Sequence, residues 1–203
     1  LFLSDNGASA EIMVRGDGHK PEAPAGSAET FLCLGPGWST ACNSPMRRHK
    51  TWNHEGGIAT PLVAHWPAGI AKESQGKVDP SLGHVVDLLP TALELAGLPV
   101  VAGPGAPELP GKSLLAVLKG QATRTDGVIW FKHEKSRALR QGDWKIVATA
   151  RAQEGEAPWE LYNLATDRGE TTDLADKEPQ RLKAMAAEWQ KRLQAYQADA
   201  RRE

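Results

Sequence analysis

The sequence predicts an α/β fold in its first part, followed by a small antiparallel sheet with a C-terminal helix. Two observations favour this architecture. Before Gly120, short apolar runs alternate with loops and one helical pattern, which is typical of layered α/β structure. After Gly120, strand patterns follow one another without helices between them, which indicates an antiparallel sheet. We therefore expect one unit over residues 1–124 and a second over residues 125–203.

The composition is that of an ordinary globular protein. The 203 residues include 24 basic and 25 acidic side chains, and 40% of the residues are hydrophobic. Nucleic acid is not an expected partner, because no basic stripe dominates the chain. No apolar run reaches the ~18 residues that a membrane span needs, so no transmembrane segment is expected. The chain starts without Met, directly on an apolar run, and we expect it to be a fragment.

Two apolar runs in the first part predict strands that are buried on both faces, as in parallel sheets. They cover residues 1–3 and 60–67, and prolines bound the second run. Residues 15–37 between them are rich in Gly, Pro and Ala, and loops of this length tend to be functional. Cys33 and Cys42 lack metal-ligand or redox spacing, so they either pair with each other or are buried thiols, the alternative that we favour.

The stretch at residues 84–99 predicts a helix. Asp87 is placed to cap its N-terminus, and Pro90 falls in the first turn, where the missing N–H of proline does no harm. Gly97 is expected to end this helix, because glycine readily adopts the conformation that follows a last helical turn.

The second part predicts short strands within residues 127–132, 136–148 and 159–164. Residues 141–143 lie where a hairpin turn belongs. From Pro179 onward, apolar side chains recur at helical spacing: Leu182, Met185, Trp189, Leu193 and Tyr196. We expect this last helix to pack on the small sheet.

Asp5 and Asn6 directly follow the first apolar run. In parallel α/β sheets, ligands gather beyond the carboxyl ends of the strands. The two side chains offer a carboxylate and an amide oxygen, which suit Ca²⁺ or Mg²⁺ better than softer metals. Gly7 permits a tight turn, so that both side chains can converge on one ion. The alternative is an Asx turn that simply closes the strand.

A run of four cationic or potentially cationic residues, Arg47 to Lys50, precedes the Gly56–Gly57 pair and the second apolar run. Beside an acidic metal site, such a run suits an anionic ester, because the cations neutralise the ester oxygens that the metal holds. Lysine supplies a compact point charge for this purpose. The alternative is a solvated basic loop.

Taken in order, these blocks resemble the C-terminal half of a formylglycine-dependent sulfatase of the arylsulfatase type. The blocks are LSDNGA, HKTWNHEGGIATPLVAHWPAGI, HVVDLLPTALELAGLP, SRALRQGDWKIVA and WELYNLATDRGETTDLA. The spacing Lys-x-x-x-x-Glu-Gly-Gly-(x)₃-Pro is fairly specific, and the ordered set covers essentially the whole chain. The resemblance implies an alkaline-phosphatase-like fold, of which this chain holds a remnant of the large α/β sheet and the small antiparallel domain.

The resemblance also implies the hydrolysis of sulfuric esters. Asp5 and Asn6 match two calcium ligands, Lys50 matches the catalytic lysine that contacts the sulfate group, and Glu55 matches a structural turn. The family nucleophile is a formylglycine made within a Cys/Ser-x-Pro-x-Arg motif. In CNSPMR the proline comes one position too late, so we reject Cys42. We expect the nucleophile in an upstream half that this chain needs, and we expect the chain alone to be inactive.

His54, His133 and Arg137 are weaker candidates for substrate contact. His54 follows Lys50 by four residues, and the other two lie on a strand that can face the cleft in this family. The expected substrate is a small-molecule or glycan sulfate ester, by analogy in the periplasm or outside the cell, although a cytoplasmic location stays open. Two alternatives are a phosphodiesterase or phosphonate monoester hydrolase of the same superfamily, and a non-catalytic relative that binds sulfated glycans.

Overall fold

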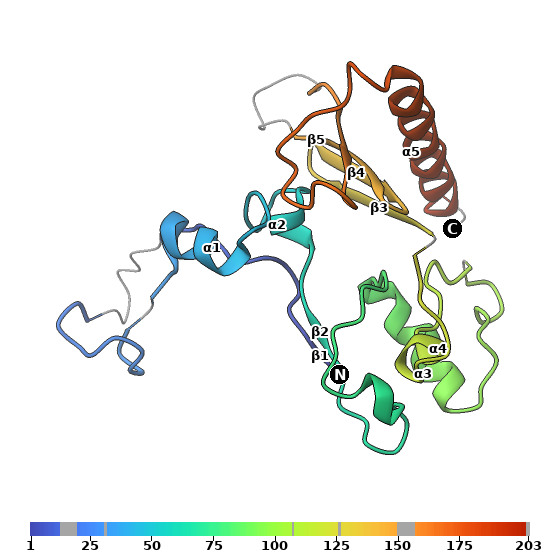
Figure 1. The fold of residues 1–203 in the computed structure, drawn as a ribbon, viewed down its shortest axis with the longest axis horizontal. Coiled ribbons are helices and arrows are strands. Elements are labelled where there is room, and N and C mark those ends of the chain that lie inside the picture. The colour runs from blue at the N-terminus through green and yellow to red at the C-terminus, as the bar shows by residue number, and fades with distance from the viewer. Residues whose placement is uncertain (13–19, 31, 107, 126, 150–156, 202–203) are drawn as a thin grey trace.

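The structure is a computed structural model that describes residues 1–12, 20–30, 32–106, 108–125, 127–149 and 157–201. In Figure 1 the small C-terminal sheet and α5 stand together, and a lobe with α3 and α4 lies apart from them. The chain before α3 holds β1, β2, α1 and α2, and in Figure 1 α1 lies to one side of both parts. The helices that precede the small sheet are α1 (Gly35–Asn43), α2 (Glu55–Ile58), α3 (Leu88–Leu95) and α4 (Leu115–Leu118).

The second part of the chain forms a four-stranded antiparallel sheet in the order β3-β4-β5-β6. Its strands are β3 (Val128–His133), β4 (Ser136–Gln141), β5 (Trp144–Ala148) and β6 (Glu160–Asn163). Gln141 pairs with Trp144 across a tight hairpin, in which Gly142 has a φ of 59° that favours glycine. The predicted strands and the predicted turn are therefore confirmed.

One face of this sheet is covered by α5 (Pro179–Asp199). Trp130 of the sheet stacks on Trp189 of the helix, with ring centroids 5.5 Å apart. Tyr196, near the helix end, is 41% exposed. The predicted packing of the helix on the sheet is confirmed by the buried core between them, which consists of Leu139, Ile146, Leu161, Met185 and Trp189, with Leu182 and Leu193 packed against it.

The two apolar runs of the first part form strands, but these strands are short and exposed. β1 (Phe2–Leu3) pairs antiparallel with β2 (Leu62–Val63). Phe2 is 73% exposed and Val63 is 56% exposed. The prediction of strands buried in a parallel sheet is therefore wrong for this chain. In the described residues this sheet has two strands, so its apolar side chains stay at the surface.

The helix predicted at residues 84–99 is present as a 3₁₀ turn, Val85–Asp87, that continues into α3. Gly97 ends it with a φ of 69°, as predicted. Asp87 occupies the N-cap position, but its side chain makes no capping bond to α3. Its carboxylate instead accepts hydrogen bonds from the backbone N–H groups of His84 and Lys112 and from the guanidinium of Arg124.

Two features of the first part differ from the prediction. The helices α1 and α2 occur where the sequence suggests a loop end and a turn. Cys33 and Cys42 are free and exposed, so they are neither a disulfide nor buried thiols. Residues 15–19 and 31 of the long predicted loop lie outside the described residues. Among the helices that the structure describes, none has both the length and the hydropathy of a membrane span.

Candidate functional site

The structure brings the Asp5–Asn6 pair and Lys50 into neighbouring segments. The backbone N–H of Lys50 donates to the carbonyl of Ala8 at 3.1 Å. The backbone N–H of Gly7 donates to the carbonyl of Gly57 at 2.9 Å. The residues that follow Asn6 are thus held against both ends of the stretch from Lys50 to Gly57, and the two predicted site segments lie side by side.

Glycine is required at this contact because the two backbones touch. A Cβ atom on Gly7 would lie 1.8 Å from the carbonyl oxygen of Gly56. A Cβ atom on Gly56 would lie 2.3 Å from the carbonyl oxygen of Arg48. The glycine of the DNG motif therefore serves the close approach of the two segments, and Gly56 serves the packing of α2 against the backbone of Arg47 and Arg48, in addition to the turns that the sequence predicts.

Asn43, the last residue of α1, forms hydrogen bonds with both of these segments. Its Oδ1 accepts a hydrogen bond from the backbone N–H of Ala8 at 2.9 Å, and its Nδ2 donates to the carbonyl of Arg48 at 3.1 Å. The residue is 6% exposed. The sequence alone does not mark Asn43, because its partner Ala8 lies 35 positions away.

The Lys50 side chain is available to an anion. Its Nζ lies 3.7 Å from Oε2 of Glu11, and the two side chains are 40% and 53% exposed. An ion pair this exposed contributes little free energy, so an incoming anion can displace Glu11. The ammonium group therefore lies at the surface of the contact between the two segments.

Asp5 is exposed and Asn6 is partly exposed, so their oxygens can reach an ion. The donor set fits calcium in kind, because a carboxylate and an amide oxygen are hard ligands. It supplies two of the roughly six to eight oxygens that Ca²⁺ takes. Among the residues that the structure describes, no group of three or more His, Cys, Asp or Glu side chains could hold a metal. The chain offers two oxygen ligands at this place, and a calcium site that uses them stays a prediction.

Glu55, the first residue of α2, is buried in an ionic cluster with the small sheet, beside which α2 lies in Figure 1. Its Oε1 accepts a hydrogen bond from Nζ of Lys145 at 3.0 Å, and its backbone N–H donates to Oε2 of Glu170 at 2.7 Å. Nζ of Lys145 lies 2.8 Å from Oε1 of Glu170, and both of these side chains are 0% exposed. Arg140 and Arg168 approach Oε2 of Glu55 at 3.6 Å and 3.4 Å.

The cluster keeps Glu55 ionised. Burial raises the pKa of this carboxyl, but attraction by Lys145 and its hydrogen bond, together with Arg140 and Arg168, outweighs burial and lowers the pKa below the ordinary value. Buried charges are tolerated when each has opposite charges and hydrogen bonds around it. The sequence predicts Glu55 as a structural turn residue but does not reveal Lys145 or Glu170, which lie in a strand and a loop of the second part.

His54 lies in a second polar cluster on the same face of the sheet. The residue is 1% exposed, and its Nε2 lies 3.2 Å from Oε2 of Glu160. The Tyr162 hydroxyl donates to the same oxygen, and Nη1 of Arg47 donates to that hydroxyl at 3.0 Å. Burial raises the pKa of Glu160, but the hydrogen bonds from His54 and Tyr162 and the charges of His54 and Arg47 lower it to about 2. A substrate contact for His54 stays a prediction.

His133 and Arg137 lie on opposite faces of the small sheet. His133 pairs with Ser136, so Arg137, the next residue of β4, points to the other side, where α5 packs. His133 is exposed at the end of β3. The guanidinium of Arg137 lies 4.4 Å from the ring centroid of Trp159, and its Nη2 donates to the carbonyl of Ala157 at 3.1 Å. The predicted substrate roles of both residues stay predictions.

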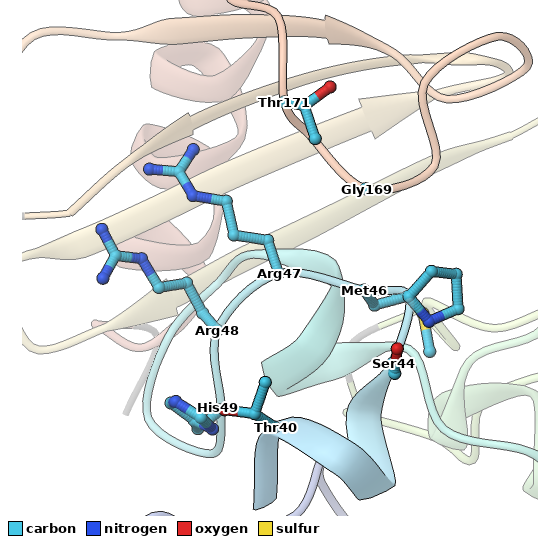
Figure 2. A pocket seen from close by; sticks show the side chains of 9 residues that line it. Thr40, Ser44, Met46, Arg47, Arg48, His49, Gly169 and Thr171 are labelled. Carbon is cyan, nitrogen blue, oxygen red and sulfur yellow. The ribbon is translucent and has the colours of Figure 1, made fainter. Parts of the chain in front are cut away.

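A pocket of about 330 Å³ lies between the α1–α2 connection and the loop after β6. Figure 2 shows that the guanidinium groups of Arg47 and Arg48 extend in the same direction, away from Ser44 and Met46. The group of Arg48 lies 4.2 Å from the ring centroid of Trp52, and that of Arg47 is bound by the second polar cluster. Both guanidinium groups at the edge of the pocket therefore already have partners within the protein. The pocket is lined by Thr40, Ser44, Pro45, Met46, Arg47, Arg48, His49, Gly169 and Thr171.

Residues 48–199 match the family model described as "N-sulphoglucosamine sulphohydrolase, C-terminal". The chain is 30% identical over 199 residues to a sulfatase of Formosa agariphila, a match that covers 89% of this chain and 35% of the relative. It is 29% identical over 212 residues to an uncharacterized sulfatase of Schizosaccharomyces pombe, with 93% of this chain and 36% of the relative covered.

Solved structures agree with these matches. The crystal structure of Ps i-CgsB in complex with k-i-k-neocarrahexaose superposes with a TM-score of 0.58 and 27% identity, over 73% of this chain and 32% of that protein. The likeness confirms the predicted α/β, alkaline-phosphatase-like fold class. The chain spans about a third of the length of the relatives that it matches. It belongs to the sulfatase family and corresponds to the C-terminal part of a sulfatase.

Proposed function

We propose that this chain supplies part of the active site of a sulfuric ester hydrolase. The observation that carries the proposal is the pair of backbone hydrogen bonds, Lys50 to Ala8 and Gly7 to Gly57, beside the Asp5–Asn6 pair. These bonds hold the backbone segments that carry Lys50 and the Asp5–Asn6 pair side by side, which supports a shared site for the ammonium group and the two hard oxygen ligands. A cation and an ammonium group side by side suit the tetrahedral, anionic head group of a sulfate ester.

Each residue has a distinct task in this proposal. Lys50 binds an oxygen of the sulfate group and stabilises negative charge during transfer, for which a compact ammonium group is well suited. Asp5 and Asn6 contribute two oxygens to a Ca²⁺ ion. That ion, when bound, supplies positive charge that orients and polarises the sulfate group. Gly7 permits the close approach of the two segments that this arrangement needs.

The remaining parts of the proposed site belong to an upstream half of the protein. We place there the formylglycine nucleophile, in a Cys/Ser-x-Pro-x-Arg motif, and the other calcium ligands. The chain as given therefore needs that half for turnover. A glycan sulfate ester is the proposed substrate class, which is supported by the similarity to Ps i-CgsB, a protein crystallised with k-i-k-neocarrahexaose.

The test is an assay of p-nitrophenyl sulfate hydrolysis by the chain extended upstream of Leu1 by its own coding sequence. Lys50→Ala is expected to lower kcat by about 100-fold or more, as the loss of one group that stabilises a transition state does. Asp5→Ala and a calcium chelator are expected to remove most of the activity. Lys77→Ala, which changes an exposed lysine in another part of the chain, is the matched control.

Three results would contradict the proposal. The first is metal-dependent turnover by the 203-residue chain alone. The second is equal activity of Lys50→Ala and Lys77→Ala. The third is a preference for bis-p-nitrophenyl phosphate or a phosphonate monoester over the sulfate, which would favour the phosphodiesterase alternative. Binding of a sulfated glycan without calcium and without turnover would favour the non-catalytic alternative.

A further inference from the structure

We propose that Lys145 and Glu170 of the small C-terminal part are positioning residues for the candidate site. Through Glu55 they hold the segment that carries Lys50, and through that segment they hold the turn that carries Asp5. This inference rests on the proposed function, because it takes Lys50 and Asp5 as site residues. It assigns to the small sheet a task at the site that is carried out without contact with the substrate.

The first step is the set of contacts by which Lys145 and Glu170 hold Glu55. Lys145 binds the Glu55 carboxylate at 3.0 Å, and Glu170 accepts a hydrogen bond from the Glu55 backbone N–H at 2.7 Å. Side chain and backbone of one residue are thus fixed by two partners from the second part of the chain. Because both partners are 0% exposed and 2.8 Å apart, they have little freedom to move separately.

The second step runs from Glu55 to the site through backbone atoms. The backbone N–H of Gly56 donates to the carbonyl of Arg47 at 2.8 Å, and the carbonyl of Gly57 accepts from Gly7 at 2.9 Å. The stretch between Arg47 and Gly57 contains Lys50, whose N–H is bound to Ala8. A backbone contact in which a Cβ atom on Gly56 would come within 2.3 Å of a carbonyl oxygen leaves no slack. A shift of Glu55 therefore shifts both site segments.

The third step is a second hydrogen bond that Glu170 accepts from the segment between Arg47 and Gly57. While its carboxylate holds the N–H of Glu55, its backbone carbonyl accepts a hydrogen bond from Nη1 of Arg47 at 3.2 Å. Glu170 has a φ of 53°, in the left-handed region that non-glycine residues rarely adopt. Such a backbone conformation persists where the surrounding contacts enforce it. Glu170 thus contacts both sides of the segment that contains Lys50.

Directional contacts distinguish this role from ordinary stabilisation. An apolar contact is indifferent to small rotations, whereas an ion pair and a hydrogen bond fix both distance and direction. Buried ion clusters are also a weak source of net stability, because desolvation of the charges offsets their attraction. The cluster of Glu55, Lys145 and Glu170 therefore contributes more to the position of α2 than to the free energy of folding.

Backbone hydrogen exchange in the 203-residue chain tests the inference. Glu170→Gln and Lys145→Met are each compared with Arg192→Ala, which changes a helix residue whose side chain is 34% exposed and lies outside the cluster. We expect the amides of Lys50 and Gly7 to exchange about tenfold faster or more in both cluster variants, as the loss of one charged hydrogen bond would produce. In Glu170→Gln, which keeps the Lys145 ammonium group beside Glu55, the amides of Leu139 and Ile146 in the sheet are expected to keep their wild-type rates.

The outcomes are decisive in both directions. Unchanged exchange at Lys50 and Gly7 in either variant overturns the inference. Equal acceleration at the sheet amides in Glu170→Gln also overturns it, since the cluster would then serve general stability. The readout does not depend on turnover. Faster exchange at the site amides in a protein that hydrolyses no sulfate ester would contradict the proposed function and leave the positioning link intact.

A kinetic readout extends the test to the upstream-extended chain. If that protein hydrolyses p-nitrophenyl sulfate, Glu170→Gln is expected to lower kcat about tenfold or more, because small misplacements of a reacting group are costly. Added calcium is expected to restore little of this loss, since Lys50 remains misplaced. Wild-type kcat in Glu170→Gln would count against the positioning role.

Discussion

The two faces of the small sheet make different kinds of contact with the segments packed on them. On the face toward α5, the apolar side chains of Leu139, Ile146 and Leu161 are covered by Met185 and Trp189. The face toward α2 holds a smaller apolar cluster, which consists of Ala138, Val147, Tyr162 and Leu164. This face also makes ion pairs and hydrogen bonds to the segment before β2, through Glu55, Lys145, Glu160 and Glu170, and we call it the polar face.

The two kinds of contact have different consequences: one stabilises the fold, and the other fixes the position of a neighbouring segment. Burial of apolar side chains supplies free energy of folding in proportion to area and without a fixed direction. Buried ion pairs gain little net free energy but hold their partners in one geometry. The polar face is the one that meets the segment with Lys50. We infer that the sheet is stabilised mainly through the face toward α5 and positions the candidate site through the other.

The largest expected effect comes from removing the centre of the apolar face. Trp189, which is 4% exposed, packs on Trp130 and Trp159. Trp189→Ala is expected to lower the free energy of unfolding of the small sheet by about 3–5 kcal/mol, the usual cost of removing a buried large aromatic side chain. Urea titration followed by circular dichroism measures it. A loss below ~1 kcal/mol would show that the apolar face is not the main source of stability.

The next effect tests the polar face. Lys145→Met leaves Glu55 and Glu170 buried without their shared cation, and the loss of one partner of a buried pair costs about 3 kcal/mol or more. Lys191→Met, which changes an exposed lysine of α5, is the matched control and should be nearly neutral. If the two methionine variants unfold at the same urea concentration, the buried cluster has no energetic consequence.

A third effect is the pH dependence of stability, to which the Glu160 carboxyl contributes and the apolar core does not. The folded pKa of Glu160 is lowered from 4.5 to about 2, so its ionised form stabilises the fold above the unfolded pKa. This contribution is lost as the pH falls from about 4.5 through about 2. Because the side chain is 31% exposed, solvent screening reduces it to roughly 2 kcal/mol.

Glu160→Gln is the variant that checks this pH dependence. Thermal unfolding between pH 5 and pH 2 should show a shallower loss of stability in Glu160→Gln than in the wild type, because the amide cannot titrate. The carboxylates that remain give the residual slope. Identical slopes in the two proteins would mean that the contacts of Glu160 with His54 and Tyr162 do not stabilise its charge.

The smallest effect belongs to the outer surface of α5. Nε of Arg192 lies 2.8 Å from Oε1 of Glu188, four residues earlier, and both side chains are about one-third exposed. Arg192→Ala should change the free energy of unfolding by less than about 0.5 kcal/mol. A loss comparable to that of Lys145→Met would remove the distinction between buried and surface charges.

Local patterns were sufficient to predict the small sheet and its helix. Alternation in the strands and helical spacing after Pro179 depend on neighbours in sequence, and so does the turn at Gly142. The Asp5–Asn6 pair was likewise chosen from its neighbours in sequence and Lys50 from the family resemblance, and the roles of these residues stay predictions. The division at residues 124 and 125 stays a prediction.

The features that escaped prediction depend on distant partners. Lys145 alternates with apolar residues like any solvent-facing strand residue, and its partner Glu55 lies 90 positions earlier. The bond from the Glu55 N–H to Glu170 spans 115 positions. The burial of Phe2 was predicted wrongly for a different reason. An apolar run predicts that other layers cover the strand on both faces, and the described residues contain no such layers.

The most direct test of the candidate site is a crystal structure of the upstream-extended chain with Ca²⁺ and sulfate. We expect calcium about 2.3–2.6 Å from a carboxylate oxygen of Asp5 and from Oδ1 of Asn6. We also expect a sulfate oxygen within about 3 Å of Nζ of Lys50. Calcium bound at other residues, with Lys50 beyond the reach of the bound sulfate, would contradict the proposed site.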